Sequence, residues 1–184
     1  MERYAPRARS DAYGRRINRA HSPLVALALP WLSILAGSLL PILFIATALP
    51  LVPPTGFLML LAWRLVRPGL LPVWAGFPLG LFDDLFSGQP LGSAIVLWSL
   101  TMLALELLDR RIPWRSFPQE WSVATLALLA YLAASFLIAG ASPTLPALVA
   151  LGPQALLSVL LFPAAARFAA ALDRLRLTRW RTTA

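Results

Sequence analysis

Residues 50–92 read PLVPPTGFLMLLAWRLVRPGLLPVWAGFPLGLFDDLFSGQPLG, and they hold two short apolar runs on either side of two arginines. The runs are Pro50–Trp63 and Gly69–Phe82, and Arg64 and Arg67 lie between them. As a helix, each run would be about 21 Å long, which is shorter than the roughly 30 Å hydrocarbon core of a bilayer. The pair is therefore either a re-entrant hairpin or two short crossings. A re-entrant hairpin would leave both arginines deep in hydrocarbon, at about 2.5–3.5 kcal/mol each. We expect two crossings, which place both guanidinium groups in cytoplasmic water.

The other arginines set the direction of these crossings. All 16 basic residues are arginine, and they fall in four segments: residues 1–22, 64–68, 109–120 and the end of the chain from Arg167. With the N-terminus in the cytoplasm, six crossings place all four segments on that side. The three outer segments, near 50–55, 83–90 and 140–145, contain no arginine. This distribution obeys the positive-inside rule, and it predicts that both ends of the chain are cytoplasmic.

The composition favours lipid as the solvent for most of the chain. Of the 184 residues, 59% are hydrophobic and 13% are charged, whereas a soluble domain carries about 25% charged residues. The net charge of +8 would also suit nucleic-acid binding, but the arginines occupy only tails and connectors, so we expect no nucleic-acid partner. The absence of cysteine excludes disulfides and thiolate metal sites. The only histidine, His21, lies in the basic N-terminal tail and is interpreted as a solvated residue.

The predicted fold is an all-α integral membrane protein with six transmembrane helices. These helices are expected at residues 24–49, 50–63, 69–82, 91–108, 121–139 and 146–168. Residues 1–22 form a basic cytoplasmic tail, residues 23–168 the six-helix membrane domain, and residues 169–184 an Arg-rich cytoplasmic tail. The first run is far longer than the roughly 7–15 apolar residues of a signal-peptide core, so we interpret it as an uncleaved helix.

A block of glycines and aspartates follows the second short run. Its members are Gly76, Gly80, Asp83, Asp84, Gly88 and Gly92. Each glycine pair has the spacing at which membrane helices approach closely. Either aspartate could cap the helix that follows by accepting its N–H bonds. We therefore expect one rigid element in which a short helix, a carboxylate turn and a second helix pack closely. The simpler alternative is that the aspartates are tolerated in an outer loop.

The sequence contains no catalytic constellation that we recognise. Glu106 precedes Arg110 by four residues, the spacing of an ordinary helical ion pair. The adjacent aspartates could hold Mg²⁺ for a lipid phosphotransferase, but such sites usually need further carboxylates, and the outer segments offer none. We therefore expect no enzyme activity, no cofactor and no metal.

Residues 57–68, FLMLLAWRLVRP, together with the block from Gly76 to Gly92, resemble the rod shape-determining protein MreD family. The resemblance is clearest over about residues 50–110. It implies a place in the bacterial inner membrane, in the machinery for cell elongation and lateral peptidoglycan synthesis. It also implies a partner, MreC, with one membrane helix, and through it MreB, RodA and a class B penicillin-binding transpeptidase.

The resemblance further implies a fold similar to the substrate-binding component of energy-coupling-factor vitamin transporters. It carries over no catalytic residues, and it maps the family motif onto Gly76, Gly80, Asp83, Gly88 and Gly92 as packing or interface positions. The long arginine-only tail at the N-terminus departs from the family pattern and leaves open a contact with anionic lipid or a cytoplasmic partner.

Our leading hypothesis is a non-enzymatic scaffold that docks the membrane helix of MreC through small residues, with its arginine tails on anionic lipid. The alternative is a solute-binding membrane component of a vitamin-type transporter, which requires a pocket with a few convergent polar groups. Candidates for such groups are sparse: Ser93, Ser99, Thr101 and Gln154.

Overall fold

The computed structural model describes residues 23–44, 52–111, 116–140 and 145–177, and every regular element within these ranges is helical. The elements are α1 (Pro23–Phe44), α2 (Thr55–Val66), the 3-10 turn η2 (Val73–Ala75), α3 (Gly76–Phe86), α4 (Ser93–Arg111), α5 (Phe117–Ile138) and α6 (Leu145–Leu177). The prediction of an all-α chain is confirmed for these residues. The predicted tail 1–22 lies outside them, and so do residues 178–184 of the predicted tail 169–184.

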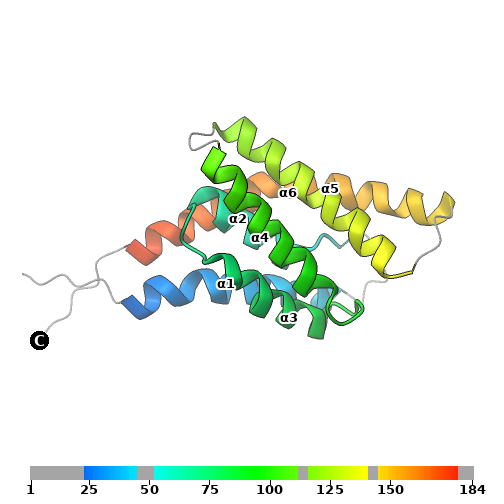
Figure 1. Cartoon of the computed structure of the whole chain (residues 1–184), viewed down its shortest axis with the longest axis horizontal. Helices are drawn as coiled ribbons and strands as arrows, with labels where there is room; N and C mark the ends of the chain where they lie inside the picture. The colour runs from blue at the N-terminus through cyan, green and yellow to red at the C-terminus, as the bar shows by residue number, and fades with distance from the viewer. Residues whose placement is uncertain (1–22, 45–51, 112–115, 141–144, 178–184) are drawn as a thin grey trace, which may run out of the picture.

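The helices run back and forth between two ends of an elongated bundle (Figure 1). We call one of these the arginine end: α2, α4 and α6 finish there, and it holds Arg64, Arg67, Arg110, Arg111, Arg174 and Arg176. At the opposite end, α3 and α5 finish and α4 and α6 begin. The sequence segments that join the helices at this opposite end, 45–54, 87–92 and 139–144, contain no basic residue. The predicted segregation of arginines therefore appears as a polarity of the bundle.

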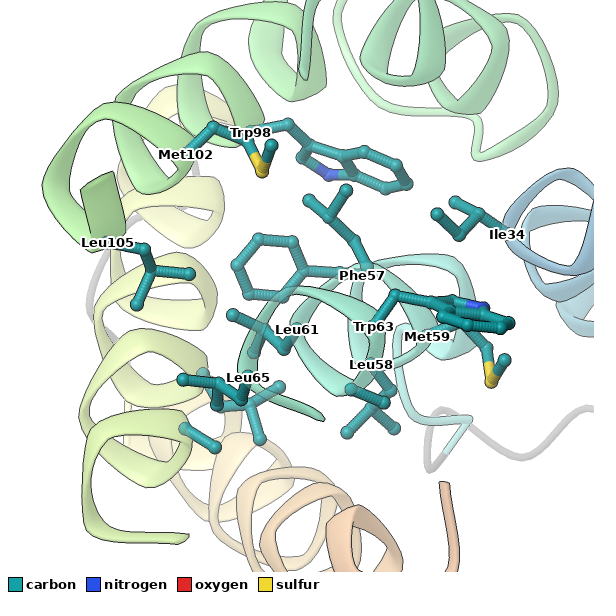
Figure 2. Close-up of a cluster of buried hydrophobic side chains, with 14 of the residues drawn as sticks. Ile34, Phe57, Leu58, Met59, Leu61, Trp63, Leu65, Trp98, Met102 and Leu105 are labelled. Carbon is teal, nitrogen blue, oxygen red and sulfur yellow. The ribbon is translucent and has the colours of Figure 1, made fainter. Parts of the chain in front are cut away.

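Helix α2 forms the centre of the bundle. Every residue from Gly56 to Leu65 is buried, as expected for a helix that is apolar on all faces. It contacts α1, α4, α5 and α6, and Figure 2 shows its side chains between Ile34 of α1 and Trp98 and Met102 of α4. Phe57 also stacks on Tyr131 of α5, with ring centroids 4.2 Å apart. The core is therefore built around the run that precedes Arg64.

Within the part of the chain that the structure describes, two helices are long and apolar enough to cross a membrane, namely Phe117–Ile138 and, within α6, Leu151–Arg176. The apolar helices Leu27–Ile42 and Thr55–Val66 are shorter. Large apolar side chains also face outward along the bundle, for example Leu126, Leu137 and Leu156, which are 71%, 72% and 62% exposed. Many large apolar side chains exposed on one bundle suit contact with lipid or with another protein, and the two long helices indicate membrane association.

Several helix boundaries differ from those expected. Helix α2 begins at Thr55 rather than Pro50, directly after Pro53 and Pro54, because proline lacks the N–H that continues a helix and restricts the residue before it. Helix α3 extends to Phe86 and so includes both aspartates. Helix α6 continues past residue 168 to Leu177, which places arginines expected in a tail on its last turn, where positive charge suits the helix dipole.

Candidate functional site

Asp84 caps α4 from the neighbouring helix α3. Its buried carboxylate accepts hydrogen bonds from the N–H groups of Gly92 (2.9 Å), Ala94 (2.8 Å) and Ile95 (3.2 Å) and from the Ser93 hydroxyl (3.0 Å). The first N–H groups of a helix have no partner within it, and a carboxylate there also suits the positive end of the helix dipole. The prediction that one of the two aspartates caps the fourth helix is confirmed, and the residue is Asp84.

The glycines of the block serve two different purposes. A Cβ atom on Gly76 would lie 2.8 Å from Cα of Ser99, and one on Gly80 would lie 2.7 Å from the carbonyl oxygen of Ala94. Both contacts are with the backbone of α4, so this pair allows the close approach that its spacing predicts. The pair Gly88 and Gly92 differs from the prediction. Neither has an atom near its missing side chain, and their φ angles are +70° and +97°, so they make the turn possible rather than a helix contact.

The block is therefore one rigid α3–α4 hairpin, as expected. Its consequence for partner binding is different, because the face of Gly76 and Gly80 is covered by α4 of the same chain. A surface for a partner helix has to be sought elsewhere on the bundle.

A cavity of about 310 Å³ opens at the end of the bundle opposite the arginines. Its walls come from the second half of α1, residues 52–56, the end of α3 with the turn after it, the end of α5 and the start of α6. The polar side chains among its lining residues are Ser38, Thr55, Asp83, Ser87, Gln89, Tyr131, Ser135 and Gln154. The volume lies at the lower end of the range of about 300–1,000 Å³ that is typical of small-molecule sites.

Asp83 lies in the wall of this cavity and is 8% exposed. The hydroxyl of Ser38 faces its carboxylate. Among the described residues its carboxylate forms no ion pair with a basic side chain. Adjacent residues of one helix thus have opposite surroundings: Asp84 accepts hydrogen bonds from a helix terminus, whereas Asp83 is a buried carboxyl group that faces a cavity.

A second polar cluster lies at the arginine end. Arg64 is 1% exposed, and its guanidinium contacts Glu106 at 2.6 Å and Asp109 at 2.9 Å, both on α4. Arg67 contacts Asp173 of α6 at 2.7 Å. The two arginines that follow the core of α2 therefore tie it to two other helices.

This cluster corrects two expectations. Arg64 is not in water, because two carboxylates from α4 enclose it in the protein, whereas Arg67 is half exposed. The predicted pair of Glu106 and Arg110 is present at 3.4 Å, but the shorter contact of Glu106 is with Arg64. No local spacing could predict that contact, since the two residues are 42 positions apart in the chain.

An apolar groove of about 600 Å³ runs between α1 and α6 over the surface of α2, and we call it the α1–α6 groove. Residues that line it include Leu32, Ala36, Leu40, Met59, Ala164 and Phe168. Ala36 and Ala164 are exposed in it. Small residues of this kind on a lipid-facing surface allow a further helix to approach closely.

The polar residues that the sequence suggested for a pocket do not come together at one site. Gln154 does line the cavity, and its Nε2 donates to the carbonyl oxygen of Val52 at 3.0 Å. Ser93 belongs to the Asp84 cap, and Thr101 bonds to the carbonyl oxygen of Leu97 on its own helix. The sequence reasoning missed Ser38, Tyr131 and Ser135, which come from distant helices and carry no local signal for a shared site.

Among the described residues, no group of three or more His, Asp or Glu side chains is placed to hold a metal ion. Comparison of the chain with protein-family models, with curated proteins and with solved structures gave no match.

Proposed function

We propose that this chain is a non-enzymatic, multi-pass scaffold of the bacterial inner membrane, with six crossings and both ends in the cytoplasm. The resemblance to the MreD family supports a role in the cell-elongation complex, and similarity to the six-helix component of energy-coupling-factor transporters belongs to the same proposal. Arginines lie at one end of the bundle, and the segments that join the helices at the opposite end contain no basic residue. This distribution supports the orientation. Arginine-rich tails would bind anionic lipid at about 1 kcal/mol per residue.

The α1–α6 groove is the observation that carries the scaffold role. Its walls are almost entirely apolar, it lies along the helix direction, and exposed alanines on two helices leave room for a third. In lipid, helix association depends on such close packing rather than on the hydrophobic effect. We assign the groove to the single membrane helix of an MreC-type partner, which would bring MreB, RodA and the class B transpeptidase into one assembly.

The test is to fill the groove. Ala36→Phe and Ala164→Phe should lower the recovery of a co-expressed MreC-type protein in pull-down about tenfold, which corresponds to about 1.4 kcal/mol. Ala133→Phe, on an exposed position of α5 outside this groove, is the matched control and should leave recovery unchanged. Equal recovery with all three variants would show that the partner binds elsewhere.

The cavity at the opposite end favours a second candidate, a solute-binding membrane component. A buried carboxylate and several hydroxyl and amide groups converge on a space of small-molecule size. Native mass spectrometry of the purified chain should detect a bound small molecule if this role is correct. A chain that carries no such molecule and binds none from a metabolite extract would argue against it.

A further inference from the structure

The cavity wall combines one carboxyl group with hydroxyl and amide side chains, and none of its lining residues is basic. Three lining residues, Pro41, Pro53 and Pro54, have no N–H group. Gln154 donates one of its two amide N–H bonds to the carbonyl oxygen of Val52. Asp83 contributes two carboxylate oxygens, which only accept when ionised, and the buried Oε1 of Gln89 has no donor among the described residues. A ligand that carries positive charge and donates hydrogen bonds would complement this wall.

Among the described residues, no basic side chain lies in the cavity wall to supply a cation for Asp83. Between residues 68 and 109, and again between 116 and 166, the sequence contains no lysine, arginine or histidine. From residue 22 to residue 63 it contains none either. The arginines that do pack in the bundle lie at the other end and pair with Glu106, Asp109 and Asp173. Because an isolated buried carboxylate is costly, a cationic ligand would remove a cost that this fold cannot remove itself.

Aromatic and hydroxyl groups complete the site. Tyr131 and Phe136 line the cavity, and aromatic rings attract cations within about 6 Å. Tyr131 is held by stacking on Phe57, and Ser135, which is 5% exposed, lies one helical turn further along α5. The set of one carboxylate, hydroxyls and aromatic rings suits an ammonium group that can donate several hydrogen bonds.

We propose that the cavity binds a protonated primary amine, with the ammonium group on the Asp83 carboxylate. The proposal deepens the solute-binding candidate and is independent of helix docking in the α1–α6 groove. Two sources share this chemistry, a small water-soluble amine and the amino headgroup of a phospholipid, because the cavity opens at the end of the bundle that the topology places at the outer surface.

The experiment uses the full chain purified in detergent and measures Kd by calorimetry and the shift of Tm. The probes are ethanolamine, its neutral counterpart ethylene glycol, and choline, which is cationic but has no N–H group. Ethanolamine should bind, and the other two should bind at least tenfold more weakly. A parallel measurement in nanodiscs of phosphatidylethanolamine or phosphatidylcholine identifies a lipid source, since only the first should raise Tm if the headgroup is the ligand.

Variants then locate the site. Asp83→Asn should weaken ethanolamine or headgroup binding at least tenfold, whereas Glu120→Gln, which removes the same charge at the start of α5, should not. Ser135→Leu keeps Asp83 but fills the cavity, so it should also abolish binding while Tm without ligand shows that the chain is folded. The proposal is wrong if Asp83→Asn binds as well as the wild type or if ethylene glycol or choline binds as well as ethanolamine. It is equally wrong if neither the amine nor phosphatidylethanolamine has an effect, an outcome that would also count against the solute-binding candidate.

Discussion

Asp83 and Asp84 are adjacent in α3, yet removal of the carboxylate should have opposite effects on stability at the two positions. The Asp84 carboxylate accepts hydrogen bonds of 2.8–3.2 Å from N–H groups at the start of α4 and from the Ser93 hydroxyl. Asp84→Ala should therefore lower the free energy of unfolding by about 2 kcal/mol, from a lost cap and from N–H groups left buried without a partner. Unfolding by sodium dodecyl sulfate in mixed micelles measures this. Ser87→Ala, on an exposed residue one turn further on, is the control and should change little.

Asp83→Asn should instead raise the free energy of unfolding of the ligand-free chain. A neutral amide costs less to bury than a carboxylate without a cation, so we expect unfolding to become harder by about 1 kcal/mol. The same unfolding assay checks it. A loss of stability as large as that of Asp84→Ala would mean that Asp83 is a structural residue and that the cavity needs no charged ligand.

The hairpin was predictable from the sequence because its causes are local. Glycine spacing and acidic residues just before a helix are signals within about twenty positions. Which aspartate caps was not predictable, because it depends on the rotation of α3 and on where that helix ends. The rest of the cavity wall was also not predictable from the sequence, because Ser38 and Tyr131 lie near Asp83 only through the packing of α1 and α5 around α2.

At the scale of elements, α2 is a short helix whose last turn carries a buried arginine. Its 12 residues span about 18 Å, so a crossing by this helix would leave Arg64 below the level of the headgroups. Glu106 and Asp109 at 2.6 and 2.9 Å neutralise it there. The positive charge of Arg64 is thereby compensated by carboxylates of α4 rather than by water, and the same contacts hold α2 against α4.

Arg64→Gln should cost about 3–5 kcal/mol in unfolding free energy, because it removes the buried cation that Glu106 and Asp109 share. Arg110→Gln is a matched control, since Arg110 contacts the same Glu106 but is 71% exposed and 3.4 Å away. An exposed pair of this kind contributes at most about 1 kcal/mol. Equal losses for the two variants, again measured in mixed micelles, would contradict the role given to Arg64.

For the whole molecule, the proposed six crossings require that α2 and α3 each cross the membrane rather than turn back within it. The chain contains no cysteine, so single cysteines can report the exposure of each connector without background. The position that separates the two arrangements is Pro68, an exposed residue between the two helices. In the crossing arrangement it lies in the cytoplasm beside Arg67, and in the re-entrant one it lies in hydrocarbon.

Ser87→Cys should react with a membrane-impermeant maleimide in intact cells, because the turn after α3 belongs to the basic-free end. Pro68→Cys and Ala184→Cys should react only after the membrane is permeabilised. The reason is electrostatic, since the guanidinium groups of the connector and the tail resist passage through hydrocarbon.

A Pro68→Cys variant that stays unreacted in permeabilised cells while Ala184→Cys reacts would establish the re-entrant hairpin and reduce the number of crossings to four. Reaction of Ser87→Cys only from the inside would reverse the orientation and place the cavity in the cytoplasm.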